Sequence, residues 1–249
     1  PYMKKIMCTL IAVVIINISC VPPAFALEND QKTQEKFAFD TVIIDNETIT
    51  VPTIPRSVKK PIATRSGSLT CYKDSVTYYL PVTEEAQAYN EELVRNSGEL
   101  TQTKPEFDPQ GYMIATSHIT YVISEGTIDG QSASDLYILI TNVALTKDKD
   151  PESIVHGGYL LGISNPVATK IICTGARPTD DFIPGTFDQE VYNVTMNWSE
   201  TGISTPSSWV PVISDKYSDM FDGYASYSYS LIYDKIGTVS CTISHEIHT

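Results

Sequence analysis

The chain has 249 residues, of which 42% are hydrophobic and 19% charged, and its 30 acidic residues outnumber its 17 basic ones to give a formal net charge of −13. A surface of this sign repels nucleic acid and anionic lipid, so the composition excludes a nucleic-acid-binding function. The length is sufficient for one sizeable core.

The N-terminus has the pattern of an export signal. A Met-Lys-Lys start at residues 3–5 precedes an apolar run over 6–16, and Ala-Phe-Ala at 24–26 matches a small-x-small cleavage site. We therefore expect a signal peptide over residues 1–26 and a secreted, extracellular protein that begins at Leu27. Removal of the signal takes away two lysines and no acidic residue, which changes the formal net charge from −13 to −15.

Two membrane-related alternatives concern the same segment. The apolar run is shorter than the ~20 residues that span a bilayer, so no transmembrane segment is predicted. A lipid anchor at Cys20 is the alternative to the soluble form, although Asn17 stands where lipoprotein signals carry a large aliphatic residue.

Residues 27–66 are predicted to form an N-terminal extension or linker ahead of the main domain at 67–249. Short strands are expected over 37–44 and 48–51. Three prolines, Pro52, Pro55 and Pro61, then fall among basic residues, a composition typical of a linker or of an extension along a sheet edge.

The main domain is predicted to be rich in β-strands with one helix. Thr83 is a suitable N-cap, Glu84 and Glu85 fall in the first turn, and Gly98 can end the segment, so a short helix is expected over 84–95. Strands are expected over 68–72, 76–82, 112–124, 136–147, 158–163, 167–174, 191–198 and 209–213. Those over 112–124 and 136–147 should pair through the polar loop 125–135.

A β-hairpin over residues 224–247 closes the chain. Apolar residues alternate with Ser and Thr on both arms, and Asp-Lys-Ile-Gly at 234–237 suits a three-residue loop. Pairing Asp234 with Thr238 would place Tyr227 opposite His245 and put both apolar rows on one face. The rings of Tyr227, Tyr229 and Tyr233 are then expected in the core.

These elements predict an all-β fold, an antiparallel β-sandwich of the immunoglobulin-like or jelly-roll-like kind. The cysteines of the expected mature chain are Cys71, Cys173 and Cys241. All three lie in apolar, strand-like contexts, and we expect buried thiols, with one disulfide as the alternative.

No catalytic residue, metal ligand or cofactor is assigned from motifs. His245-Glu246-Ile247-His248 is one residue short of the zinc-protease motif, and Ser164 lacks the second glycine of a nucleophile elbow. The acidic pairs 148/150, 180/181 and 219/222 are candidates for calcium or for a glycosidase-like acid and base, but solvated carboxylates are commoner in so acidic a chain.

Aromatic content is the most distinctive feature, with 15 tyrosines and two tryptophans. Aromatic side chains present rigid, amphipathic area to sugars and protein partners. Trp209, Tyr217 and Tyr224 fall near predicted turns and are the candidate ligand-binding residues.

The signal sequence, the Thr-Pro-Ser-Ser-Trp-Val-Pro-Val segment at 205–212 and the Tyr-rich hairpin together resemble uncharacterised small secreted β-sandwich proteins of Gram-positive bacteria. This resemblance implies no activity. The first hypothesis is a non-enzymatic extracellular interaction module that binds a protein or glycan. The alternatives are an extracellular glycan-acting hydrolase and a structural envelope component.

Overall fold

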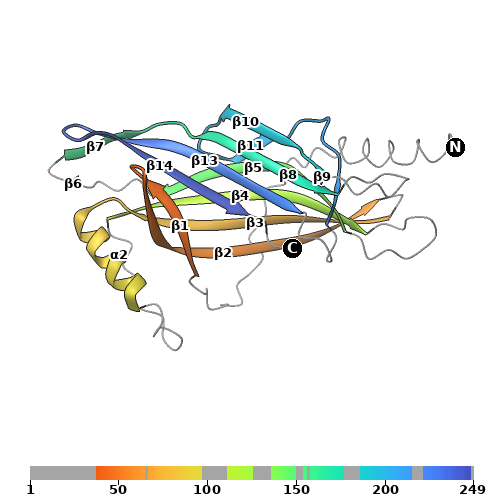
Figure 1. Cartoon of the computed structure of the whole chain (residues 1–249), viewed down its shortest axis with the longest axis horizontal. Coiled ribbons are helices and arrows are strands. Elements are labelled where there is room, and N and C mark those ends of the chain that lie inside the picture. Colours follow the sequence, from red (N-terminus) through yellow and green to blue (C-terminus); the bar gives the residue numbers. More distant parts are fainter. Residues whose placement is uncertain are drawn as a thin grey trace.

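The fold is an antiparallel sheet that curls strongly into a half-barrel (Figure 1). The computed structural model describes residues 38–64, 67–96, 111–125, 136–149, 154–155, 158–176, 186–214 and 221–247. Every strand pair within these ranges is antiparallel. The predicted signal peptide and Cys20 lie outside the described residues.

The described elements reproduce most of the predicted ones. In chain order they are β1 (Ala38–Ile44), β2 (Glu47–Thr64), β3 (Gly67–Pro81), α2 (Glu84–Asn96), β4 (Tyr112–Glu125), β5 (Leu136–Lys149), β6 (Ile154–Val155), β7 (Gly158–Ile163), β8 (Val167–Ala176), β9 (Thr186–Phe187), β10 (Glu190–Thr195), β11 (Ser199–Ser204), β12 (Val212–Ser214), β13 (Asp222–Tyr233) and β14 (Gly237–Glu246). The predicted pairing of β4 with β5 is confirmed. Two predicted strands merge into β3, and the strand predicted over 191–198 ends early, at Thr195.

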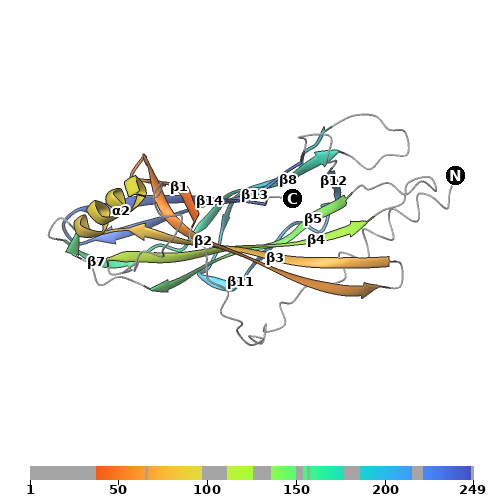
Figure 2. The ribbon, with the colours of Figure 1, turned by 90° about the horizontal axis from the view of Figure 1, so that it is seen from below.

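The all-β antiparallel class is confirmed, but the two-sheet sandwich is wrong. The strand order is β10-β8-β12-β5-β4-β3-β2-β1-β14-β13-β7-β6, and β8 also pairs with β13. Figure 2 shows β2 to β5 as one wall and β8, β13 and β14 as the other. Strand β1 joins the walls on one side, and the short β12 pairs with both β5 and β8 on the other. Strands of 14 to 18 residues accumulate enough twist for one sheet to enclose its own core.

The proline-bearing stretch that suggested a linker forms most of β2, the 18-residue strand. Each of its prolines falls at a position where β2 pairs with only one other strand among the described residues. Pro52 pairs with β1 just before pairing with β3 begins at Thr53, whereas Pro55 and Pro61 follow the last β1 pair. Proline is tolerated there because no partner strand needs its missing N–H group. The predicted boundary at residue 66 therefore separates two strands, β2 and β3, that pair along their length.

Helix α2 confirms the predicted helix and its cap. The Thr83 hydroxyl accepts a hydrogen bond from the Ala86 backbone N–H at 3.0 Å, as an N-cap requires. Ala86, Asn90 and Leu93 are the buried residues of the helix. The helix lies beside one end of the sheet, against β2 and β3 (Figures 1 and 2).

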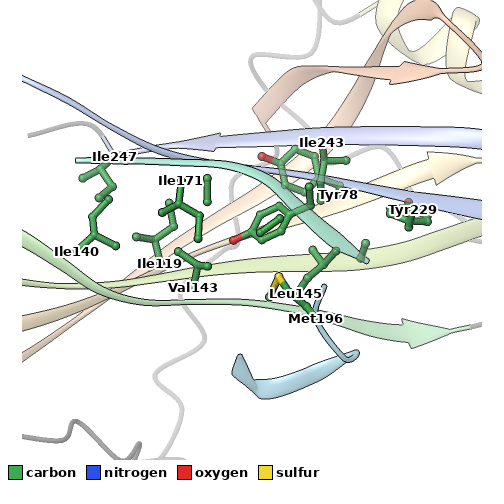
Figure 3. Packing of buried hydrophobic residues seen from close by; sticks show 14 of the residues in the cluster. Tyr78, Ile119, Ile140, Val143, Leu145, Ile171, Met196, Tyr229, Ile243 and Ile247 are labelled. Atoms are coloured by element: carbon green, nitrogen blue, oxygen red, sulfur yellow. The ribbon is translucent and has the colours of Figure 1, made fainter. Parts of the chain in front are cut away.

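The core lies inside the curl. Figure 3 shows Ile119, Ile140 and Ile171 gathered from β4, β5 and β8, with Ile247, the residue that follows β14. The hairpin tyrosines Tyr227, Tyr229 and Tyr233 are 0%, 3% and 4% exposed, which confirms that they belong to the core. The described cysteines, Cys71, Cys173 and Cys241, are buried thiols that form no disulfide, as expected.

The hairpin pairs two residues away from the predicted register. Tyr233 lies opposite Gly237, Tyr227 opposite Ile243, and His245 opposite Ala225. A shift of two residues keeps the same side chains inside, so the face was predicted correctly although the partners were not. In this register Asp234 is bound to β7: the Tyr159 N–H donates to the Asp234 carboxylate at 2.7 Å, and the Asp234 N–H donates to the Tyr159 carbonyl. Asp234 is thereby engaged by β7 instead of closing the β13–β14 ladder.

Candidate ligand-binding surface

The three predicted ligand-binding residues have different outcomes. Tyr224 is a half-buried residue of β13, and Tyr217 lies outside the described residues. Trp209 is 6% exposed, so the expectation that it lies at the surface is wrong. Gln189 makes two hydrogen bonds to the backbone of Val210, the residue that follows Trp209. The Gln189 Oε1 accepts the Val210 N–H at 2.6 Å, and the Gln189 Nε2 donates to the Val210 carbonyl at 2.8 Å. We call this pair of hydrogen bonds the clamp, and it lies next in the chain to the buried indole of Trp209.

Tyr224 belongs to an exposed cluster with Lys170 and Tyr192. The Lys170 Nζ lies 5.6 Å from the ring centroid of Tyr224 and 5.7 Å from that of Tyr192, so the ammonium stands between two aromatic rings. Both distances are within the range of cation–π attraction. Tyr192 is 53% exposed, which leaves most of its ring open to solvent.

Glu190 completes the polar part of this cluster. Its carboxylate lies 3.6 Å from the Lys170 Nζ and also accepts a hydrogen bond from the Tyr192 hydroxyl. That hydrogen bond raises the pKa of Tyr192, and a hydrogen bond to Tyr224 raises the pKa of Lys170. One ammonium therefore connects two phenol rings and a carboxylate.

Strand register places these four side chains on the outer face of the sheet. Tyr192 of β10 lies opposite Lys170 of β8, and Lys170 lies opposite Ser226 of β13. Tyr224 precedes Ser226 by two residues and so points to the same side. We call Lys170, Glu190, Tyr192 and Tyr224 the Tyr-Lys surface.

Two carboxylates border the Tyr-Lys surface. Glu246 of β14 lies opposite Tyr224, and Asp222 precedes Tyr224 by two residues on β13. Burial, and after it the charge of Glu246, raises the pKa of the Asp222 carboxyl. The Tyr-Lys surface therefore has carboxylate acceptors on one side. At its centre it has two aromatic rings and one donor, the Lys170 ammonium.

Rows of hydroxyl groups extend the same face along the hairpin. Ser226 lies opposite Ser244, and their hydroxyls are 3.0 Å apart. Ser228 lies opposite Thr242 and Ser230 opposite Ser240. This part of the outer face is polar and uncharged.

Sequence reasoning missed Lys170, Glu190 and Tyr192. In 190–195 Glu190 and Tyr192 stand on either side of Val191, which packs against the core, so the sequence indicates that these two face outward, whereas Lys170 is followed by four buried residues at 171–174 and shows no such alternation. What the sequence does not reveal is that β10 and β13 both pair with β8, which brings these residues to Tyr224.

The other residues singled out in the sequence are structural. His245 is 2% exposed inside the curl, and its Nδ1 lies 2.9 Å from the Ser117 hydroxyl, which also donates to the Tyr227 hydroxyl at 3.2 Å. The imidazole therefore lies among the buried residues of the interior. Trp198 packs edge-on against Tyr229 and does not join the Tyr-Lys surface.

Within the described ranges, no group of three or more His, Cys, Asp or Glu side chains is arranged to hold a metal ion. Of the three acidic pairs, only Asp148 and Asp222 fall in those ranges. None of the helices described there is long and apolar enough to cross a bilayer. Comparison of the chain with protein-family models, with curated proteins and with solved structures finds no match.

Proposed function

We propose that the protein is an interaction module that binds a glycan at the Tyr-Lys surface. The observation that carries this proposal is the placement of Lys170 between the exposed ring of Tyr192 and the half-buried ring of Tyr224. Sugar rings have apolar C–H faces and polar edges, so they suit a surface where rigid aromatic rings stand beside charged hydrogen-bonding groups.

The surroundings favour an extended, uncharged glycan over a charged one. Lys170 is accompanied by Glu190, Asp222 and Glu246, so an anionic polymer would meet a surface with more negative than positive charge. Sugar hydroxyls can donate to these carboxylates and accept from the ammonium. The hydroxyl rows on β13 and β14 offer further contacts along the same face.

We also propose that the protein acts outside the cell, after export and cleavage behind residue 26. The basis is the signal pattern at residues 3–26. Mass spectrometry of the protein from its native host should give a mature N-terminus at Leu27. An acylated N-terminus at Cys20 would contradict the soluble form and support the lipid-anchored one.

A glycan array followed by calorimetric titration tests the binding proposal. Wild-type protein is expected to bind neutral glycans, and Tyr192→Ala and Tyr224→Ala should each weaken binding about tenfold, the equivalent of about 1.4 kcal/mol. Tyr159→Ala is the matched control, because Tyr159 is an exposed tyrosine on β7, outside the Tyr-Lys surface. A wild-type protein that binds no glycan, or an equal loss on Tyr159→Ala, would count against the proposal.

A further inference from the structure

Asp74 has a buried carboxylate oxygen that lacks a partner. It lies on β3 opposite Ile119 of β4, a fully buried residue. Its Oδ2 accepts a hydrogen bond from the Tyr121 hydroxyl at 3.2 Å, whereas Oδ1 has no hydrogen-bond partner among the described residues. A buried carboxylate oxygen without a donor is costly, so this oxygen, which no described residue satisfies, is an acceptor open to a ligand's donor.

An aromatic stack stands beside this carboxylate. The rings of Tyr72 and Tyr121 are nearly parallel, at 8°, with centroids 5.2 Å apart. Tyr72 lies opposite Tyr121 in the register of β3 and β4, and Asp74 follows Tyr72 by two residues on the same face. The carboxylate and the stacked rings therefore share one place on the inner face of the sheet.

A cation already lies against this stack. The Lys59 Nζ is 5.7 Å from the ring centroid of Tyr72, and Lys59 lies opposite Tyr72 in the register of β2 and β3. The Lys59 side chain is otherwise exposed, so it can leave the ring at little cost. Its position shows that the face of Tyr72 accepts an ammonium group.

We propose that Asp74, Tyr72 and Tyr121 form a binding site for a small organic ammonium ion. An alkylammonium has N–H donors for Oδ1 and a positive charge for the carboxylate, and it is attracted to the faces of aromatic rings. An anion is repelled by Asp74. A neutral alcohol supplies an O–H donor for Oδ1. It has no positive charge to be attracted by the carboxylate or by the aromatic rings, so it binds more weakly.

This site is separate from the Tyr-Lys surface. It is built on β3 and β4, on the inner face of the sheet, whereas the Tyr-Lys surface lies on the outer face of β8, β10 and β13. The two proposals can therefore succeed or fail independently, and Tyr192→Ala should leave ammonium binding unchanged.

Lys59 gives the proposal a sharp test, because it competes with the ligand for the ring of Tyr72. Lys59→Met removes the competing cation and should tighten ammonium binding about two- to fivefold. Lys60→Met is the matched control: it makes the same change in net charge, but Lys60 lies opposite Cys71 instead of Tyr72. Only Lys59→Met should free the ring.

The experiment is an NMR titration of the full chain with n-butylammonium, n-butanol and butyrate. Millimolar n-butylammonium should shift the Tyr72 and Tyr121 ring resonances, n-butanol should shift them about tenfold more weakly, and butyrate should not shift them. Asp74→Asn, which keeps the side-chain shape, should weaken n-butylammonium binding about tenfold or more.

Three results would overturn the proposal. The first is no n-butylammonium shift in either wild type or Lys59→Met. The second is equal binding of n-butanol, which would mean that Oδ1 needs only a neutral donor such as water. The third is unchanged affinity in Asp74→Asn. Because the comparison of probes uses the wild-type chain, it remains decisive even if a variant folds poorly.

Discussion

The Ser117 hydroxyl and the His245 imidazole meet inside the curl, with Oγ and Nδ1 2.9 Å apart. Ser117 belongs to β4 and His245 to β14, and β3, β2 and β1 separate these strands along the sheet. The contact therefore crosses the interior and links the two walls. It is a buried polar contact, and Tyr227 shares it through the same hydroxyl.

Removing the Ser117 hydroxyl should destabilise the protein. Ser117→Ala takes away the group that His245 and Tyr227 share in the core, and the expected loss is about 1–3 kcal/mol in the free energy of unfolding by urea titration. Ser244→Ala removes an exposed hydroxyl and should change stability by less than about 0.5 kcal/mol. Equal stability of the two variants would show that the buried contact contributes nothing.

A second histidine should make stability depend on pH. His118 Nδ1 lies 2.7 Å from the Ser75 hydroxyl and Nε2 lies 3.4 Å from that of Thr146, which suits a neutral ring that accepts at one nitrogen and donates at the other. Burial, with a smaller effect of Lys73, lowers the pKa of His118 to about 4 from its ordinary 6.5.

The direction of this pH dependence follows from the numbers of protons that the folded and the unfolded chain bind. Between about pH 6.5 and pH 4 the unfolded chain takes up a proton at His118 that the folded chain does not, so the free energy of unfolding falls as the pH decreases through that window, by up to about 3 kcal/mol. His118→Asn should reduce this slope in urea titrations at several pH values. An NMR titration that places the His118 pKa near its ordinary value would contradict the prediction.

Local elements of the fold could be predicted from sequence, whereas the closure of the sheet could not. Helix α2 is signalled by Thr83 and the acidic residues after it, within a few positions of one another. The pairing of β1 with β14 joins residues about 200 positions apart, as in Ile44 with Cys241. Alternation shows that each strand buries one face, but a sandwich and a curled sheet share that pattern.

For the candidate site, as for the fold, local features could be predicted from the sequence and long-range contacts could not. Tyr224 was identified because the residues around it predict a turn and a strand, which are local features. Trp209 was misplaced because its burial is set by the fold: Gln189, 20 positions away, bonds to the backbone of the next residue, Val210, and this contact is visible only in the structure. Lys170 and Tyr192 become neighbours of Tyr224 only through the register of three strands.

The hairpin register should depend on Asp234. Because the Asp234 carboxylate accepts the Tyr159 N–H at 2.7 Å, Asp234→Ala should lower the free energy of unfolding by about 1–2 kcal/mol and increase amide hydrogen exchange in β7. Lys235→Ala, in the same loop, is the control and should have little effect on either measurement. If both variants leave exchange at Tyr159 unchanged, β7 does not hold the turn.

The position of Trp209 should depend on Gln189. Gln189 is buried and bonds to the backbone of Val210 on both sides, so Gln189→Ala should release this segment and expose the indole. In a Trp198→Phe background, Trp209 alone among the two tryptophans contributes to the fluorescence. Its emission should then shift to longer wavelength on Gln189→Ala, and an unchanged spectrum would show that the clamp is not needed.

The free thiols should be unreactive until the protein unfolds. Burial raises the pKa of Cys173 to about 11 and that of Cys241 to about 12, so at neutral pH almost none of the reactive thiolate forms and reagents have no access to it. A thiol reagent should label neither residue in the native state. In denaturant without reductant it should label both, together with Cys71, because none of the three is in a disulfide. Peptide mapping that finds any two of them joined by a disulfide would contradict this result, and rapid native labelling of Cys241 would show that the interior opens at that point of β14.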